Sequence, residues 1–304
     1  MSRSSLPLAS LRGTRKRFGP VVALDGVDLD IHAGEVVAVL GANGAGKTTA
    51  LGLLTGRLTA DDGEATLFGL DPRDPTARQG IGVMLQAASL PDGLRVAEHV
   101  RLQSAYYGSP RPLAETLALA GVADLAKRGY ADLSGGQQRR VQFALAICGR
   151  PPLLFVDEPT TGLDVEARRG FWQVLRTLRD AGTAIVLTTH YLEEADALAD
   201  RVVVLAGGRV IAHDTPAALK ARAAGRRVRA RTRLPAAVLA VWPEVAAVRV
   251  ADGITDVASA DPEALLRRWL AADDTLAGLE VRALTLEETF LALTGADRIA
   301  EVAA

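Results

Sequence analysis

At residues 41 to 48 the chain reads Gly41-Ala42-Asn43-Gly44-Ala45-Gly46-Lys47-Thr48, which matches the phosphate-loop pattern G-x-x-x-x-G-K-T. An apolar run, Val36 to Leu40, precedes the loop, and a helix-forming stretch, Thr48 to Arg57, follows it. Strand, loop and helix thus occur in the order that the pattern requires. Glycines let backbone N–H groups turn toward phosphate oxygens, and a helix N-terminus adds partial positive charge. We predict an α/β nucleotide-binding fold, because a glycine-rich turn without a ligand needs neither flanking element.

A second apolar run, Leu153 to Val156, ends in two acidic residues, Asp157 and Glu158. A continuously apolar run of this length is typical of a strand buried on both faces of a parallel sheet. Carboxylates placed directly after such a strand are costly unless they face a cation or reach the surface. We therefore predict that this pair lies beside a metal-bound nucleotide, with a surface acidic pair as the alternative.

The third motif is the turn Leu133-Ser134-Gly135-Gly136-Gln137, which opens a predicted helix that ends near Cys148. Ser134 is a good N-cap, and capping alone explains a serine at this position. Capping does not explain two consecutive glycines, each of which costs about 1 kcal/mol in a helix interior. Glycine does suit the close approach of a backbone to a ligand. The turn therefore predicts a second anion-binding site, and we expect a partner chain to complete each active site.

Taken together, the three motifs resemble those of the ATP-binding cassette family over residues 10 to 215. The resemblance implies a P-loop NTPase cassette with a RecA-like core, an N-terminal antiparallel β subdomain and a helical subdomain that carries the signature turn. It also implies ATP and Mg²⁺ as ligands and ATP hydrolysis as the activity. Lys47 would bridge the β and γ phosphates, and Thr48 would offer its hydroxyl to Mg²⁺. Asp157 would lie beside the metal, and Glu158 would be the general base that polarises the attacking water.

The same resemblance assigns roles to three residues outside these motifs. Gln86, at the end of a predicted strand from Ile81 to Leu85, would contact Mg²⁺ and report the nucleotide state to a membrane partner. Phe18 would stack on adenine, since stacking needs only a π face. His190, after a predicted strand from Ala184 to Thr189, would contact the γ phosphate and hold the attacking water. Without the resemblance, the glutamine and the histidine would be ordinary residues of strand ends and loops.

These inferences give a full set of predicted site residues. The predicted catalytic residues are Lys47, Glu158 and His190, and the predicted metal ligands are Thr48, Gln86 and Asp157. Asp164 ends a loop from Pro159 that the family places across the dimer interface, and it is also able to cap the next helix. The residues expected to contact nucleotide, some of them across the dimer, are Phe18, Gly41, Asn43, Gly44, Ala45, Gly46, Lys47, Thr48, Thr49, Gln86, Ser134, Gly135, Gly136, Gln137 and Asp164.

The length of 304 residues suits one cassette, residues 8–217, followed by a small accessory domain, residues 218–304. The second part has the short strands and helices of an α+β domain. Its final helix begins with the capping box Thr285-Leu286-Glu287-Glu288. This ending resembles the drug-resistance (daunorubicin-type) branch of exporter ATPases. The apolar stripe of the final helix consists of Leu286, Phe290 and Leu293.

Charge and hydrophobicity limit the partners. The net charge of −1 gives no electrostatic argument for binding nucleic acid. One run, Lys220 to Arg233, holds seven basic residues and no acidic one. It is either a solvated strand face near the domain junction or a contact for anionic lipid headgroups or a partner's cytoplasmic loops. The longest apolar stretch, Ala236 to Trp242, has seven residues, whereas a membrane-spanning helix needs ~20. With one cysteine and no signal-peptide pattern at the start, we expect a cytoplasmic chain.

Three classes of function remain open from the sequence. The first is the ATPase subunit of a membrane exporter, a homodimer at the cytoplasmic face of the membrane that binds separate transmembrane permease subunits. The second is the ATPase of an importer, which a solute-binding protein encoded nearby would favour. The third is a cassette protein acting on ribosomes or DNA. Only 85 residues separate Thr48 from Ser134, too few for a long coiled coil, and the sequence has no second cassette. We favour the exporter, whose substrate would be selected on another chain.

Overall fold

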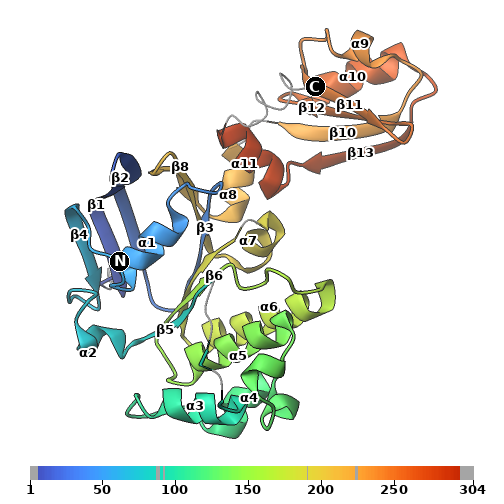
Figure 1. The fold of residues 1–304 in the computed structure, drawn as a ribbon. Helices are drawn as coiled ribbons and strands as arrows, with labels where there is room; N and C mark the ends of the chain where they lie inside the picture. Colours follow the sequence, from blue (N-terminus) through green and yellow to red (C-terminus); the bar gives the residue numbers. More distant parts are fainter. Residues whose placement is uncertain (1–5, 87–89, 92, 190, 223–224, 295–304) are drawn as a thin grey trace. The chain divides into compact units, whose positions relative to one another are not determined.

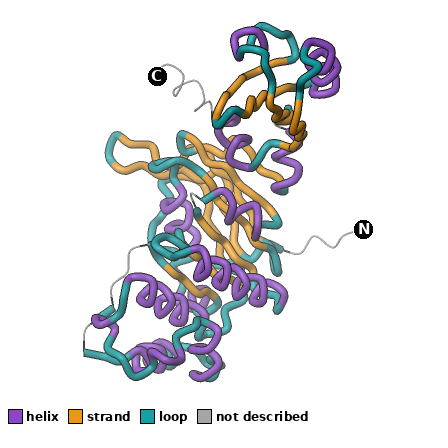
Figure 2. The backbone as a smooth tube through the Cα atoms, turned by 90° about the vertical axis from the view of Figure 1, so that its right-hand side faces the viewer, coloured by secondary structure: helices purple, strands orange, loops and turns teal. Residues whose placement is uncertain are grey.

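The computed structural model of the chain describes residues 6–86, 90–91, 93–189, 191–222 and 225–294, so His190 lies outside the described residues. The chain divides into two compact units, the first ending at Thr215 and the second beginning at Pro216. Figures 1 and 2 trace the elements of both units, which we describe one at a time.

The first unit begins with an antiparallel sheet of three strands in the order β2-β1-β4. Its strands are β1 (Ala9–Phe18), β2 (Val21–Ile31) and β4 (Asp62–Leu67). Along β2, Val27, Leu29 and Ile31 are buried. Alternate residues of a strand point to opposite faces, so one face of this sheet packs on the core of the unit.

A six-stranded sheet forms the centre of the first unit, in the order β5-β6-β7-β3-β8-β9. The pairs from β5 through β8 are parallel, and β9 returns antiparallel through the hairpin Gly207-Gly208. Every residue of β3, β6 and β7 is buried, as their apolar sequences predict. Because parallel strands end at one edge, the segments after β3, β5, β6 and β7 meet there. The strands are β3 (Val36–Leu40), β5 (Ile81–Met84), β6 (Leu153–Asp157), β7 (Ala184–Thr188), β8 (Arg201–Ala206) and β9 (Arg209–Asp214).

Helix α1 (Lys47–Leu54) follows the phosphate loop, and its apolar side chains join those of both sheets in one core cluster. The expected helix to Arg57 is too long. It ends because Gly56 adopts the left-handed conformation with φ +67°, which glycine tolerates best. A Cβ on Gly56 would also lie 2.1 Å from the carbonyl oxygen of Pro72, so only glycine fits at this turn.

A group of helices forms the rest of the first unit, with α3 and α4 at the opposite end from the three-stranded sheet (Figure 1). Helix α5 packs directly on β5, since a Cβ on Gly82 would lie 2.0 Å from the carbonyl oxygen of Ala146. This arrangement confirms the predicted α/β cassette with its helical subdomain. The helices are α2 (Pro75–Arg78), α3 (Val96–Ser104), α4 (Leu113–Leu119), α5 (Gly135–Ile147), α6 (Val165–Asp180) and α7 (Leu192–Leu198), with 3₁₀ turns at Ala123–Leu125 and Tyr130–Asp132.

The second unit is an α+β fold with a four-stranded antiparallel sheet in the order β11-β12-β10-β13. Its core contains Val228, Val257, Leu265 and the fully buried Trp269. The strands and helices of this unit confirm the α+β character that the sequence predicts for this part of the chain. The elements are α8 (Pro216–Arg222), β10 (Arg226–Arg231), α9 (Ala236–Leu239), β11 (Val245–Ala251), β12 (Ile254–Ser259), α10 (Pro262–Ala272), β13 (Ala277–Ala283) and α11 (Leu286–Thr294).

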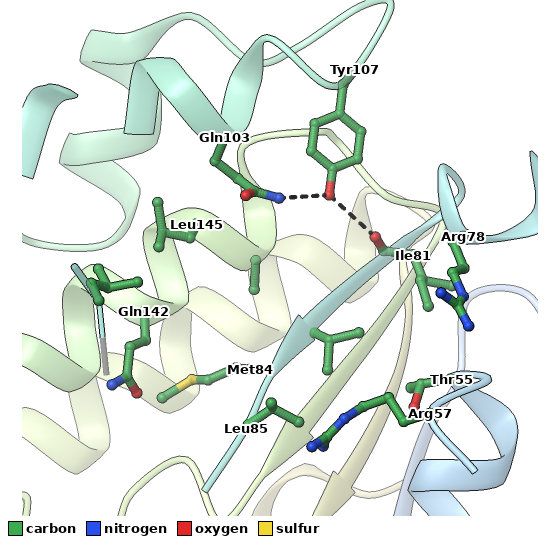
Figure 3. A pocket seen from close by; sticks show the side chains of 13 residues that line it. Thr55, Arg57, Arg78, Ile81, Met84, Leu85, Gln103, Tyr107, Gln142 and Leu145 are labelled. Atoms are coloured by element: carbon green, nitrogen blue, oxygen red, sulfur yellow. Dashed lines mark hydrogen bonds between the residues drawn. The ribbon is translucent and has the colours of Figure 1, made fainter. Parts of the chain in front are cut away.

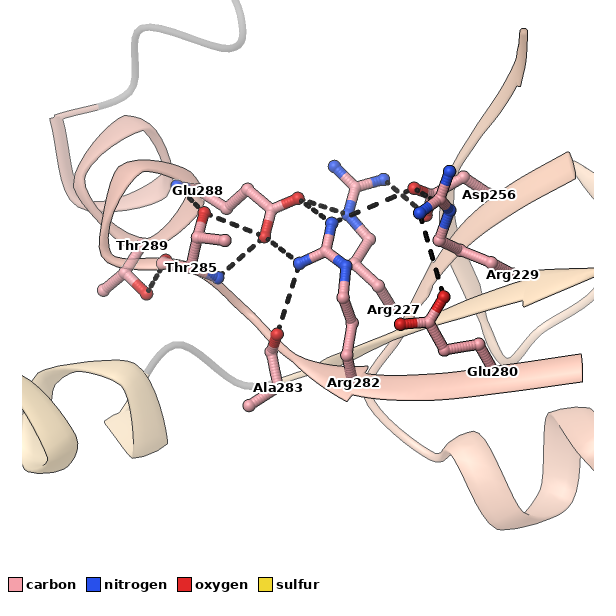
Figure 4. Close-up of polar contacts among 9 residues, drawn as sticks. All are labelled: Arg227, Arg229, Asp256, Glu280, Arg282, Ala283, Thr285, Glu288 and Thr289. Carbon is pink, nitrogen blue, oxygen red and sulfur yellow. Dashed lines mark hydrogen bonds and ion pairs between the residues drawn. The ribbon is translucent and has the colours of Figure 1, made fainter. Parts of the chain in front are cut away.

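The sheet face opposite this core carries the central arginines of the basic run, and Figure 4 shows their acidic partners. Arg227 pairs with Glu288 at 3.1 Å and with Asp256 at 3.5 Å, and Arg229 pairs with Asp256 at 3.6 Å. Burial raises the pKa of Glu288, but its bonds to Arg282 and to the N–H of Thr285 lower it to about 2. Arg227 and Arg229 are therefore part of an ion-paired strand face.

The start of α11 has the capping box that the sequence predicts. The backbone N–H of Thr285 donates to the Glu288 carboxylate at 2.8 Å, and the N–H of Glu288 donates to the Thr285 hydroxyl at 3.2 Å. Leu286 is buried and Phe290 is half-buried, while the side chain of Leu293 lies outside the described part of the structure. In the described part of the chain, no helix combines the length and the apolar character needed to span a membrane.

Candidate active site

The phosphate loop connects β3 to α1, and its backbone geometry requires its glycines. Gly44 and Gly46 have φ angles of +80° and +104°, in the left-handed region that side chains rarely adopt. A Cβ on Gly46 would lie 2.5 Å from the carbonyl oxygen of Ala23. A Cβ on Gly41 would lie 2.6 Å from the carbonyl oxygen of Leu205. A larger residue would therefore clash at Gly41 and Gly46 and would strain the backbone at Gly44.

Lys47 is the first residue of α1, and its side chain folds back over the loop. Its Nζ donates to the carbonyl oxygens of Gly41 at 2.6 Å and of Ala42 at 3.2 Å. Burial lowers the pKa of this ammonium group, although the carboxylates of Glu158 and Asp157 raise it. The loop thus holds a buried cation beside its own backbone N–H groups, an arrangement that favours bound phosphate.

A cleft of about 460 Å³ opens beside the phosphate loop, a volume in the range of small-ligand sites. It brings together predicted residues from four separate stretches: the end of β1, the loop itself, and the segments after β5 and β6. Phe18, at the end of β1, lines the cleft and is 48% exposed. The cleft is lined by Phe18, Val21, Ala23, Asn43, Gly44, Ala45, Gly46, Lys47, Thr48, Thr49, Gln86 and Glu158.

The acidic pair lies at the end of β6, and different partners hold its two carboxylates. Asp157 is 3% exposed and accepts a short hydrogen bond from the hydroxyl of Thr188 on β7. Glu158 lines the cleft, and its Oε2 accepts hydrogen bonds from Gln86 Nε2 at 2.9 Å and from Thr161 Oγ1 at 3.4 Å. The fold thus joins Gln86 and Glu158, two predicted site residues that are 72 positions apart.

The backbone of Glu158 is strained. Its φ angle is +46°, a left-handed conformation that costs a residue other than glycine about 1–3 kcal/mol. The surrounding structure holds this conformation, because the N–H of Glu158 donates to both the carbonyl oxygen and the hydroxyl of Thr188, each at 3.1 Å. Strain of this kind persists where neighbours fix it, and here it sets the direction of the carboxylate that faces the cleft.

The three predicted metal ligands have the donor chemistry of a Mg²⁺ site. Thr48 and Gln86 line the same cleft, and Asp157 directly precedes Glu158. They offer a hydroxyl, an amide carbonyl and a carboxylate, and Mg²⁺ prefers such oxygen donors together with waters and substrate phosphates. Because the Nε2 of Gln86 donates to Glu158, the side-chain oxygen of Gln86 is the atom suited to a metal. The residues present therefore fit Mg²⁺.

The signature turn lies elsewhere in the unit. Ser134 caps α5, since its hydroxyl accepts from the N–H of Gln137 at 3.4 Å, and its own N–H donates to the Gln137 side chain at 3.0 Å. Ser134 and Gly135 are exposed. Asp164 caps α6 by accepting from the N–H of Ala167 at 2.8 Å. Among the described residues that line the cleft, no residue of the signature turn appears, and neither does Asp164.

Two residues at the site were missed by the sequence interpretation. Thr188 hydrogen-bonds Asp157 through its side chain and the Glu158 backbone through both its hydroxyl and its carbonyl oxygen. Arg139, on α5, donates to carbonyl oxygens at the ends of two strands, including that of Glu158 at 2.5 Å. A threonine in a strand and an arginine in a helix carry no local signal for these contacts, because the partners are set by strand order and by how α5 docks.

Comparison with known proteins identifies the family. The ABC transporter family matches residues 24–161. A daunorubicin/doxorubicin resistance ATP-binding protein of Streptomyces peucetius is 39% identical over 306 residues, covering 93% of this chain and 91% of the relative. The chain belongs to the ABC transporter family. A Nod factor export ATP-binding protein of a Rhizobium species is 37% identical and covers 97% of this chain and 98% of the relative.

Solved structures give the same answer for the fold of this ABC protein. An ATP-binding subunit of an ABC transporter superposes with a TM-score of 0.66 at 27% identity, covering 71% of this chain and 92% of that one. A dimeric ATP-binding cassette in a post-hydrolysis state with ADP and Pi has a TM-score of 0.63 at 28% identity, covering 68% and 98%. The first unit is thus the family's ATP-binding cassette, and the chain is an ATPase subunit of a transporter.

Proposed function

We propose that this ABC ATPase drives export of a small or lipophilic compound, as a dimer at the cytoplasmic face of the membrane that couples ATP hydrolysis to separate transmembrane permease subunits. One observation carries the shared active site. The cleft gathers the phosphate loop, Gln86 and Glu158, whereas the signature turn, whose Ser134 and Gly135 are exposed, does not line it. A second copy with the same turn is the natural source of that half of the site in a symmetric dimer.

Within each cleft, we assign a separate role to each of the described residues. The phosphate loop and Lys47 would hold the phosphates, and Phe18 would stack on the adenine. Glu158 would accept a proton from the attacking water, since its carboxylate faces the cleft and is aimed by a fixed backbone. Thr48, Gln86 and Asp157 would hold Mg²⁺, which supplies charge neutralisation of the phosphates when bound. The proposed role of His190 concerns a residue outside the described part of the chain.

Export is favoured over import by the similar proteins. Relatives that match over nearly the whole chain are named for drug resistance and for Nod factor export. The cassette chemistry is the same in both directions, so the alternative remains the ATPase of an importer. A neighbouring reading frame that encodes about six membrane spans and no cassette would support export, whereas a neighbouring solute-binding protein would support import.

We further propose that the permease subunit contacts a groove in the first unit, whose lining side chains Figure 3 shows. It has a volume of about 380 Å³ and is lined by side chains of β5, α5 and the α3 region, including Met84, Leu85 and Leu145. Tyr107 and Gln103 are hydrogen-bonded to each other beside it. Leu85 immediately precedes Gln86, so a permease segment in this groove would sense the strand end that contacts Glu158.

The proposed division into a motor, residues 8–217, and an accessory domain, residues 218–304, follows the chemistry. Every residue assigned to ATP lies in the first unit. The second unit has its own core around Trp269 and an ion-paired sheet face. We therefore assign the second unit to assembly of the dimer or of the transporter.

Mixing two inactive variants tests the shared site. Lys47→Ala removes the cation from the phosphate loop, and Ser134→Arg blocks the signature turn. A dimer of one variant with the other has one site that lacks both elements and one site that is intact. At equal amounts, random pairing should restore up to about a quarter of the wild-type ATPase rate, because half the dimers each have one good site.

Each variant assayed alone is the control, and each should stay inactive. Activity in the mixture above that of both controls supports sites built from two chains. If no ratio of the two variants restores activity although co-purification of differently tagged chains detects mixed dimers, the shared-site proposal is wrong.

A further inference from the structure

The side chain of Arg139 joins the signature helix to the two strand ends that carry Gln86 and Glu158. Its Nη1 donates to the carbonyl oxygens of Leu85 at 2.7 Å and of Gln86 at 2.9 Å, after β5. Its Nη2 donates to the carbonyl oxygens of Asp157 at 3.1 Å and of Glu158 at 2.5 Å, at the end of β6. One guanidinium therefore holds four backbone carbonyls on two neighbouring strands.

This contact completes the support of the strained residue. The N–H of Glu158 is held by Thr188, and its carbonyl oxygen is held by Arg139. With both ends fixed, Glu158 stays in its left-handed conformation. The same guanidinium fixes the backbone of Gln86, whose side chain donates to the Glu158 carboxylate. Both the backbone and the carboxylate of Glu158 thus depend on Arg139, one directly and the other through Gln86.

Only an arginine can make this set of bonds. A guanidinium is planar and presents several N–H donors in a fixed fork, whereas the lysine ammonium is a compact point donor on a flexible stem. Burial lowers the pKa of Arg139, and the nearby Asp157 and Glu158 carboxylates raise it. Burying the Arg139 guanidinium costs desolvation energy, which a side chain that only made the surface soluble would not incur.

The position of Arg139 in α5 gives these bonds a second consequence. It lies two residues after Gln137, in the opening turns of the helix that Ser134 caps. Helix α5 therefore has the signature turn at its start and Arg139, which holds the backbone of Glu158, about one turn later. Movement of α5 would move both together.

We propose that Arg139 is a positioning residue, which holds Glu158 and Gln86 in register with the signature turn of the same chain. Binding of that turn to the partner's nucleotide would then fix the hydrolytic groups of the chain's own cleft. The proposal rests on the proposed shared-site function and adds a link between the two sites of a dimer.

Arg139→Lys tests the proposal, with Arg140→Lys as the matched control. Arg140 is the next residue of the same helix, and its Nη1 donates to the carbonyl oxygen of Gly121, away from the cleft. For Arg139→Lys we expect kcat to fall about 10- to 100-fold, the usual effect of removing an outer-shell partner. The dissociation constant for ATP should stay within about threefold, because the phosphate loop is untouched. Arg140→Lys should keep both values within about twofold.

Two further readouts separate positioning from folding. The melting temperature of Arg139→Lys should remain well above the assay temperature. Arg139→Ala, if it folds, should likewise lower kcat while leaving the dissociation constant for ATP nearly unchanged. In a Glu158→Gln background, Arg139→Lys should lower the residual rate by less than about twofold. If Arg139 acts through Glu158, the effects of the two substitutions on the rate are not additive.

The proposal is overturned if Arg139→Lys keeps kcat within threefold of wild type, or if it lowers the rate equally in the Glu158→Gln background. An equal loss in Arg140→Lys overturns it as well. If Glu158→Gln abolishes hydrolysis while Arg139→Lys has no effect, only the role of Arg139 is refuted and the proposed function stands. If the unmodified chain neither binds nor hydrolyses ATP, both are refuted.

Discussion

Glu158→Gln isolates the chemistry of the proposed general base from its packing. Glutamine has nearly the same shape as glutamate, and its amide oxygen can accept the hydrogen bonds that Gln86 and Thr161 donate to Oε2. The strained backbone at this position keeps its bonds to Thr188 and Arg139. The substitution therefore removes basicity and one negative charge, and leaves the fold intact.

The expected loss follows from that change. Removing a general base slows a reaction by about 10²- to 10⁴-fold. A 10²-fold loss corresponds to about 2.7 kcal/mol of transition-state stabilisation. Binding should not weaken, because Lys47 keeps its contacts with the loop carbonyls and the cleft loses a charge that repels phosphate. ATP should therefore accumulate in the cleft and stabilise the dimer.

The assay combines phosphate release, ATP binding and size-exclusion chromatography with ATP and Mg²⁺. Glu166→Gln, an exposed change in the first turn of α6, is the matched control and should behave as wild type. The reasoning is wrong if Glu158→Gln retains more than about a tenth of the wild-type rate, since a lost general base costs far more than that. It is also wrong if the variant no longer binds ATP while remaining folded.

Two further predictions concern stability. The pKa of Glu288 is about 2, below its ordinary value of 4.5, so its contribution to stability is present above pH 4.5 and lost as the pH falls toward 2. Across that window, the difference in free energy of unfolding between wild type and Glu288→Gln should shrink, as urea titrations at each pH would measure, and a constant difference would contradict the assigned ion pair. Gly82→Ala should destabilise the first unit by about 1–3 kcal/mol, because its Cβ would lie 2.0 Å from the carbonyl oxygen of Ala146 and force α5 away from β5. Gly108→Ala, where a Cβ meets no atom within 4 Å, is its control, and equal melting temperatures for the two variants would refute this packing.

The local parts of the fold were readable from the sequence because they depend on neighbouring residues. The apolar runs of β3, β6 and β7 are buried throughout, as their composition predicts. The caps at Ser134 and Thr285 form the bonds that their spacing requires. Family resemblance then connected these pieces to ATP, which the residue pattern alone would have left as a nucleotide of unknown kind.

Tertiary structure decided what these elements do to one another. The hydrogen bond between Gln86 and Glu158 exists because β5 and β6 are neighbours in the sheet, although the residues lie far apart in the chain. The left-handed backbone of Glu158 is stable only with bonds from Thr188 on β7 and Arg139 on α5. Strand neighbours and helix docking result from the packing of the whole core, so no local pattern encodes them.

The basic run shows the same division between local pattern and packing. From sequence, the run from Lys220 to Arg233 was interpreted either as a solvated strand face or as a contact for anionic lipid headgroups or a partner's cytoplasmic loops. The partners of Arg227 and Arg229, Asp256 and Glu280, come from the neighbouring strands of the folded sheet. The sequence determines only the net charge of this run. Folding decides which acidic side chains lie close enough to pair with its arginines, and therefore whether the strand face is basic or neutral.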